Sequence, residues 1–187
     1  MAQSRTKERV ITRNVIKALG FAGAISVALV APNSTVLIET YMKHMDKKNA
    51  KKTLRYLKYR KLIEVREKNG TYYYKLTSKG HDKFEKVVIE DLKIPVPKRW
   101  DKKWRLVMFD IPAAHHKKRQ FLLQKLRGMD FYKLQQSAWI HPFNCEKQIG
   151  TILQYLKLEQ HVSLLVVEKG NFIDHATDRF KKAGLLM

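Results

Sequence analysis

The sequence has little cysteine, little acidic charge and no apolar run of membrane-spanning length, and each shortage narrows the class of protein. A single cysteine, Cys145, stands among 187 residues. One thiol cannot form an internal disulfide, and such scarcity is typical of proteins that work in a reducing compartment. We therefore predict a cytoplasmic protein without structural disulfides.

The apolar stretch over residues 18–31, ALGFAGAISVALVA, is 14 residues long. A helix needs about 20 apolar residues to cross a bilayer, so this stretch does not predict a membrane anchor. A signal peptide is the alternative, because basic residues precede the stretch. Pro32 directly after it and Glu8 in the charged segment before it argue against cleavage. We predict a buried helix that starts near Thr6, and no membrane partner.

The shortage of acidic residues leaves the chain strongly basic, with 38 lysines and arginines against 17 acidic residues and a formal charge of +21. Such a balance disfavours a basic partner and favours a polyanion, of which nucleic acid is the usual case. Residues 1–100 carry 23 basic and 9 acidic groups, and residues 101–187 carry 15 and 8. The first half is therefore the stronger candidate for contacts with phosphates.

The first half reads as helices followed by a hairpin. A capped helix is predicted from Ser34 to about Met45, and a second helix over residues 47–63, where Ala50, Leu54 and Leu57 share one face. Strands are predicted at 62–66 and 71–76, joined by residues 67–70 with an Asn-Gly pair that suits a tight turn. The segment LTSKG then leads into a helix that ends near Leu92.

This order of helix, short turn, basic helix and hairpin resembles a winged helix-turn-helix domain over residues 6–92. The LT-x-x-G element after the hairpin also occurs in such domains. In them the second helix of the pair enters the major groove of DNA, and the hairpin forms the wing. The resemblance implies double-stranded DNA as the partner.

Prolines at 95 and 97 deny helix and central-strand hydrogen bonds, so residues 93–102 are interpreted as a linker. After the linker the pattern predicts a strand at 104–109, a helix at 113–127, strands at 131–135 and 137–142, a helix at 145–156 and a strand at 162–168. A last helix at about 172–183 is predicted outside that core. This is the βαββαβ order of a ferredoxin-like domain.

The predicted fold class is therefore α+β, with an N-terminal winged helix-turn-helix followed by a ferredoxin-like βαββαβ domain. The domain boundaries are expected at 1–92 for DNA binding, 93–102 for the linker and 103–187 for dimerisation. The segments WRLVMFDIP and LQQSAWIHPF make the second half similar to the central domain of PaaX-like transcriptional regulators. That domain is itself similar to CRISPR-associated endonucleases of the Cas-two type.

The resemblance implies a homodimeric DNA-binding transcriptional regulator, a repressor, that acts on an inverted-repeat operator. Regulators of this family typically carry a further C-terminal domain, which this sequence, ending at Met187, is expected to lack. The residues themselves identify no small-molecule effector. A scaffold that binds nucleic acid without sequence preference is also compatible with the net charge.

Asp110, at the end of the strand in WRLVMFDIP, has two interpretations. In the Cas-two type the matching aspartate is a proposed metal ligand, which implies a Mg²⁺-dependent nuclease or a CRISPR adaptation subunit with an appended DNA-binding domain. Magnesium prefers few carboxylates together with waters and substrate phosphates. Alternatively, the carboxylate caps the strand and favours the start of the next helix. We favour the second interpretation, and hence no enzyme and no cofactor.

The basic helix carries the clearest functional pattern, because tyrosines alternate with cations and few acids compensate them. Base or near-base contacts are predicted for Asn49, Lys52, Thr53 and Tyr56. Contacts nearer the phosphates are predicted for Arg55, Lys58, Tyr59 and Arg60. The wing-tip residue Lys68 is predicted to contact the DNA backbone or the minor groove, and Lys48 and Lys51 complete the predicted DNA-binding set. The histidines and Cys145 have no zinc-ligand spacing and no visible activating partner.

Overall fold

The computed structural model describes residues 10–21, 47–68 and 71–186, and for residues 47–50, 67–68 and 71–73 it describes the backbone alone. The chain divides into two compact units, Met1–Val88 and Ile89–Met187. The predicted helix at 34–45 and most of the apolar stretch at 18–31 lie outside the described residues. In the described ranges, no helix is both long and apolar enough to cross a bilayer.

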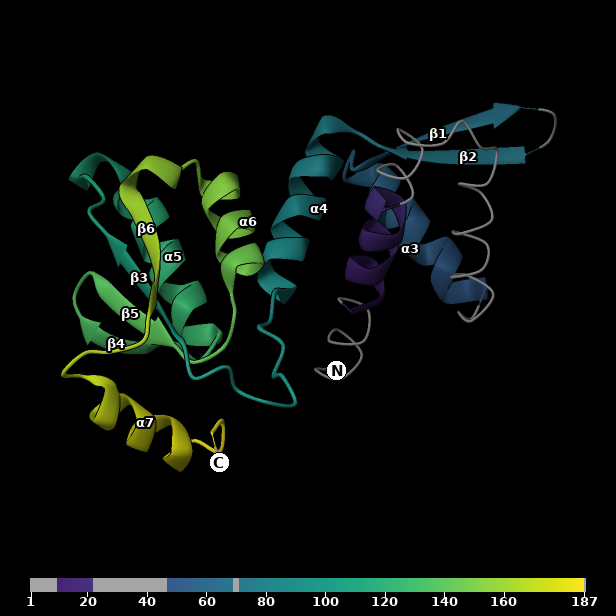
Figure 1. Cartoon of the computed structure of the whole chain (residues 1–187). Helices are drawn as coiled ribbons and strands as arrows, with labels where there is room; N and C mark the ends of the chain where they lie inside the picture. Colours follow the sequence, from purple (N-terminus) through teal and green to yellow (C-terminus); the bar gives the residue numbers. More distant parts are fainter. Residues whose placement is uncertain (1–9, 22–46, 69–70, 187) are drawn as a thin grey trace, which may run out of the picture. The chain divides into compact units, whose positions relative to one another are not determined.

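The first unit contains a helix over residues 10–21, α3 (Lys47–Tyr59), a hairpin and the start of α4 (Ser78–Asp91) (Figure 1). Strands β1 (Ile63–Lys68) and β2 (Thr71–Leu76) pair antiparallel with Lys68 opposite Thr71, so the predicted hairpin is confirmed. One cluster of buried side chains joins the helices to the hairpin. Its members are Val15, Ile16, Leu19, Leu57, Leu62, Ile63 and Leu76.

The LT-x-x-G element holds the first turn of α4 against the chain between α3 and β1. Thr77 accepts a hydrogen bond from the Gly80 amide at its Oγ1 (3.0 Å) and donates its hydroxyl to the Lys61 carbonyl (2.7 Å). A Cβ added at Gly80 would lie 2.0 Å from the Leu62 carbonyl oxygen. Thr77 is therefore a helix cap that also ties α4 to the end of α3. Gly80 permits this close approach because it has no side chain.

The second unit contains β3 (Trp104–Phe109), α5 (His116–Gly128), β4 (Tyr132–Gln135), β5 (Ala138–His141), α6 (Glu146–Leu156) and β6 (Val162–Val167). The strands form an antiparallel sheet in the order β4-β5-β3-β6. Helices α5 and α6 lie on the same side of this sheet (Figure 1). The predicted βαββαβ order is thus present. The predicted linker residues 93–102 contain neither helix nor strand, and the division between the units falls earlier, inside α4.

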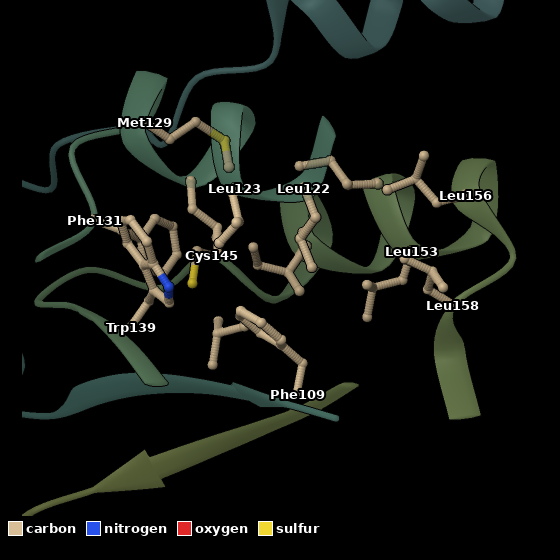
Figure 2. Packing of buried hydrophobic residues seen from close by; sticks show 14 of the residues in the cluster. Phe109, Leu122, Leu123, Met129, Phe131, Trp139, Cys145, Leu153, Leu156 and Leu158 are labelled. Carbon is tan, nitrogen blue, oxygen red and sulfur yellow. The ribbon is translucent and has the colours of Figure 1, made fainter. Parts of the chain in front are cut away.

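The two faces of this sheet carry separate apolar clusters. Val107 and Phe109 of β3 pack with α5 and α6, and Cys145 lies among the side chains of the same cluster (Figure 2). Trp104 and Ile140 face the other way and pack with α7 (Ile173–Lys182), which places this last helix outside the βαββαβ core, as predicted. Alternation along β3 produces both faces, because successive strand residues point to opposite sides.

Three helices end without glycine in the same hydrogen-bonded geometry. Their terminal residues Lys61, Asp130 and Lys157 adopt left-handed backbone angles with φ of 55°, 62° and 53°. After each one, the next amide donates to a carbonyl five residues back, as Leu62 does to Leu57. The two residues joined by each of these bonds are apolar and buried, namely Leu57 with Leu62, Leu126 with Phe131 and Leu153 with Leu158. This apolar contact and the double hydrogen bonding define a Schellman motif and offset the strain of a side chain at positive φ.

An ion pair fastens the chain that leads into β3. The Arg105 guanidinium, itself buried, donates to both carboxylate oxygens of Asp101 at 2.8 and 2.5 Å. These hydrogen bonds hold the pKa of the Asp101 carboxyl below its usual range. Beside them, the Trp100 indole donates to the Pro142 carbonyl at 2.7 Å and packs edge-on against Trp104. The residues just before β3 are therefore an integral part of the second unit.

The buried His141 makes the second unit sensitive to acid. Its side chain is 2% exposed, and its Nδ1 accepts a hydrogen bond from the Phe143 amide at 3.1 Å. Burial lowers the pKa of His141 to about 4, because the apolar surroundings penalise the charged ring. As pH falls, the His141 imidazole therefore takes up its second proton in the unfolded chain at a higher pH than in the folded chain. Stability from His141 is complete above about pH 6.5 and is lost as pH falls through about 4.

We expect the free energy of unfolding of the second unit to fall by about 3 kcal/mol between pH 7 and pH 4 because of His141 alone. In His141→Asn, which keeps an acceptor for the Phe143 amide but does not titrate, this contribution should be absent. Urea unfolding of both proteins across this pH range gives the free energy of unfolding as a function of pH, and the difference between the two curves is the His141 contribution. Parallel curves would show that His141 does not carry the acid sensitivity.

Candidate nucleic-acid interface

Helix α3 is positioned by one apolar side and by its ending. Leu57 is fully buried and Leu54 packs against the first unit's core, so this side of the helix is fixed. The Lys61 and Leu62 amides close the last turn by donating to the Lys58 and Leu57 carbonyls, each at 2.9 Å. The chain therefore leaves the helix at Lys61 and enters β1 at Ile63, and the opposite side of α3 faces outwards.

The outer side of α3 is basic and aromatic. Its sequence, KKNAKKTLRYLKY, contains no acidic residue. The exposed members among the predicted contacts are Lys51, Lys52, Arg55, Tyr56, Lys58, Tyr59 and Arg60. Tyr59 is 84% exposed and Tyr56 45%, which is unusual for aromatic side chains in a small unit with a core to fill. The helix thus presents cations and π faces together, the side chains that contact phosphates and bases.

Thr53 is a correction to the predicted set. Its side chain is only 4% exposed, because it lies one helical turn from Leu57 on the buried side of α3. A buried threonine is not available to a DNA base in this conformation, so Thr53 is removed from the predicted contacts. Lys48, Asn49 and Lys68 lie on described backbone, in α3 and at the end of β1, but their side chains lie outside the described residues.

Asp110 directly follows β3. Its side chain is exposed, and its amide donates to the His161 carbonyl at 3.0 Å, continuing the pairing of β3 with β6. The centroids of the His115 and His161 rings lie 5.7 Å apart. Within the described part of the chain, no three His, Cys, Asp or Glu side chains are grouped to hold a metal ion. The predicted Mg²⁺ ligand Asp110 thus belongs to no cluster of three such side chains among the described residues.

Cys145 is a structural residue. The side chain is fully buried, and burial raises the pKa of the Cys145 thiol to about 12. A protonated, inaccessible thiol is a poor nucleophile. Cys145 also occupies the position just before α6, whose first turn is closed by the Ile149 amide donating to the Cys145 carbonyl at 2.9 Å. A small side chain at the start of a helix is what the sequence predicts there.

Several cations of the second unit have structural partners that sequence patterns do not reveal. Arg119 lies over the Phe109 ring with 5.8 Å to its centroid, and Arg127 lies over the Trp139 ring at 5.6 Å. Lys125 donates to the Glu90 carbonyl at 3.1 Å. These contacts join positions distant in sequence, so no local spacing could identify them. They give part of the charge on α5 a role in packing rather than in binding.

Comparison with known families adds one finding. Residues 97–178 match the family model described as the PaaX protein central Cas2-like domain. The match spans β3 through most of α7 and supports a PaaX-like protein, which is consistent with a transcriptional regulator. No curated protein matches the chain.

Proposed function

We propose that this protein is a DNA-binding transcriptional repressor that acts as a homodimer on an inverted-repeat operator. The observation that carries the proposal is the outer side of α3, where exposed cations and two exposed tyrosines stand on a helix without acids. The PaaX-like match of the second unit supports the same class of protein.

In the proposed complex, α3 lies in the major groove of double-stranded DNA. An α-helix fits that groove, and base edges there distinguish all four base pairs. Lys52, Arg55 and Tyr59 share the centre of the outer side, because they follow one another at helical spacing. Tyr56 and Arg60 flank them. The β1-β2 hairpin directly after α3 is the proposed wing, with its tip beside the phosphate backbone.

Homodimerisation would give this interface its specificity. Two copies related by a two-fold axis place two α3 helices on successive major grooves, about 34 Å apart per helical turn. The operator of such a dimer is an inverted repeat. Asp110 in this proposal caps β3 and takes no part in cleavage.

Selection of bound duplexes from a random DNA pool tests the function directly. The full chain is expected to enrich an inverted repeat whose half-sites are one or two helical turns apart. Enrichment of a single half-site would contradict the homodimer, and a bound pool without any shared motif would contradict sequence-specific regulation. A parallel selection with the charge-reversed α3 variant described in the Discussion is the control, and it should enrich nothing.

A further inference from the structure

Strand β6 lies at one end of its sheet. The sheet order β4-β5-β3-β6 gives β6 one neighbour, β3, among the described residues. The Asp110 amide bonds to the His161 carbonyl, whereas the Phe109 amide turns the other way, to the Ser137 carbonyl before β5. Hydrogen-bonded and non-hydrogen-bonded pairs alternate in an antiparallel ladder. Ser163, Leu165 and Val167 therefore bond to β3. Val162, Leu164 and Val166 direct their amides and carbonyls away from the sheet.

The two edges of this sheet differ in their protection against pairing with another strand. Edge strand β4 contains Lys133 and has an irregular register between Lys133 and Gln135. A lysine and a bulge are both common devices that block edge-to-edge association. Edge strand β6, VSLLVV, has no charge, no proline and a regular six-residue register. The open edge is thus uncharged in a chain whose net charge is +21.

The exposed side chains of β6 lie on both faces of the sheet. Leu165 is 45% exposed on the face that carries α7, and Val166 is 49% exposed on the face that carries α5 and α6. A partner that packed on one face would cover only one of them. A strand added beside β6 would flank both, because neighbouring strands place side chains on the two faces alike.

We propose that β6 pairs with β6 of a second copy of this chain, antiparallel, to join the two sheets into one. This inference rests on the proposed homodimer and specifies its interface. A second copy fits because two strongly basic chains repel each other except where their surfaces lack charge, and β6 is such a surface on both partners. Antiparallel pairing of identical strands also generates the two-fold symmetry of a closed dimer.

One register uses every outward group. With the two-fold axis at Leu164, that residue faces its own counterpart, and Val162 faces Val166 of the second copy. All three outward residues then exchange their amide and carbonyl hydrogen bonds across the axis. The same register brings two exposed, oppositely charged residues to each end of the interface, Lys169 of one copy and Glu159 of the other.

The decisive variant is Val166→Pro, compared with Val166→Thr in the full chain. Proline removes an outward amide and leaves the bonds between β6 and β3 intact, a place where edge strands tolerate it. Threonine keeps the amide and the branched shape. The mass of each protein is measured by sedimentation over a range of concentrations. The native chain and Val166→Thr should have the mass of a dimer, and the dimer dissociation constant of Val166→Pro should be at least about 100-fold higher. Unchanged thermal unfolding of Val166→Pro at low concentration shows that its fold is intact.

A cysteine at Leu164 tests the register by a second route. Opposed residues of a bonded pair lie about 5.5 Å apart at Cα, within the range of a disulfide. Leu164→Cys should form a covalent dimer on oxidation, and Ser163→Cys, whose counterpart is displaced along the strand, should not. Native Cys145 is buried and does not interfere. Equal cross-linking of both variants would overturn the register.

The outcomes separate this interface from the proposed function. A Val166→Pro protein that still dimerises and still selects an inverted repeat overturns the β6 interface and leaves the regulator proposal standing. Loss of dimers in Val166→Pro, in a chain that selects no DNA motif, supports the interface and contradicts the regulator. A native chain that stays monomeric at every concentration and on DNA overturns the interface together with the homodimer.

Discussion

Charge reversal of Lys52 and Arg55 together is expected to weaken binding to the selected DNA by at least about 100-fold, which equals about 2.7 kcal/mol. Both side chains are exposed at the centre of the outer side of α3. Glutamates there would both remove attraction and repel phosphates. The variant Lys52→Glu/Arg55→Glu should also lower the slope of log affinity against log salt by about 1.8, since each neutralised phosphate contributes about 0.9.

The matched control is Lys79→Glu/Lys83→Glu. These lysines are exposed on α4 in the same unit, and their reversal changes the net charge of the protein by the same amount. Titration of labelled operator at several salt concentrations compares the two variants with the native chain. Equal losses in both would mean that only net charge matters, which would contradict docking of α3. Native affinity in the α3 variant would place the DNA elsewhere.

The arrangement of the second unit follows from local patterns. The apolar run WRLVMF predicted the strand at 104–109, and the structure has β3 at Trp104–Phe109. The helix predicted at 145–156 is α6, Glu146–Leu156, where the apolar period matches a helix with one buried side. Helix α6 is predictable because it buries one face, which imposes the helical period on its sequence, and β3 because burial on both faces gives a continuous apolar run.

Helix ends and helix sides are less predictable. The Schellman endings at Lys61, Asp130 and Lys157 have no glycine, so the usual signal for a helix end is missing. Thr53 was predicted to flank the basic side of α3 and contact bases, but it is 4% exposed. A threonine is small and partly apolar, so the packing of the unit decides which way it faces. Its position beside Leu57 on the helix was the available signal.

Long-range contacts explain why the candidate sites were only partly predictable. No spacing in the sequence indicates that Arg119 lies over Phe109, or that Arg127 lies over Trp139. The open edge of β6 is likewise a property of the strand order, which places β3 and not β6 at the centre of the sheet. The sequence VSLLVV alone suits a central strand equally well.

The largest effect on stability is expected at Gly80, within the LT-x-x-G element. Gly80→Ala should destabilise the first unit by about 3 kcal/mol, the upper range for overpacking. The new Cβ would lie 2.0 Å from the Leu62 carbonyl oxygen and 3.1 Å from its carbon. Both are backbone atoms, so no side chain can turn aside to relieve the contact. The loss should appear even though alanine favours an isolated helix over glycine by about 1 kcal/mol.

Gly150→Ala is the control for this substitution, because Gly150 lies inside α6 and a Cβ there meets nothing within 4 Å. That variant should gain up to about 1 kcal/mol from helix propensity alone. Thermal and urea unfolding should show opposite signs of the change in the free energy of unfolding for the two variants.

Gly80 lets α4 approach Leu62 and lets Thr77 cap the helix. Gly80→Ala should therefore also weaken DNA binding at temperatures where the first unit begins to unfold, whereas the unfolding temperature of the second unit should not change. A Gly80→Ala protein as stable as the native chain would mean that α4 can move away from β1 at no cost, and that the LT-x-x-G element does not fix the base of the hairpin.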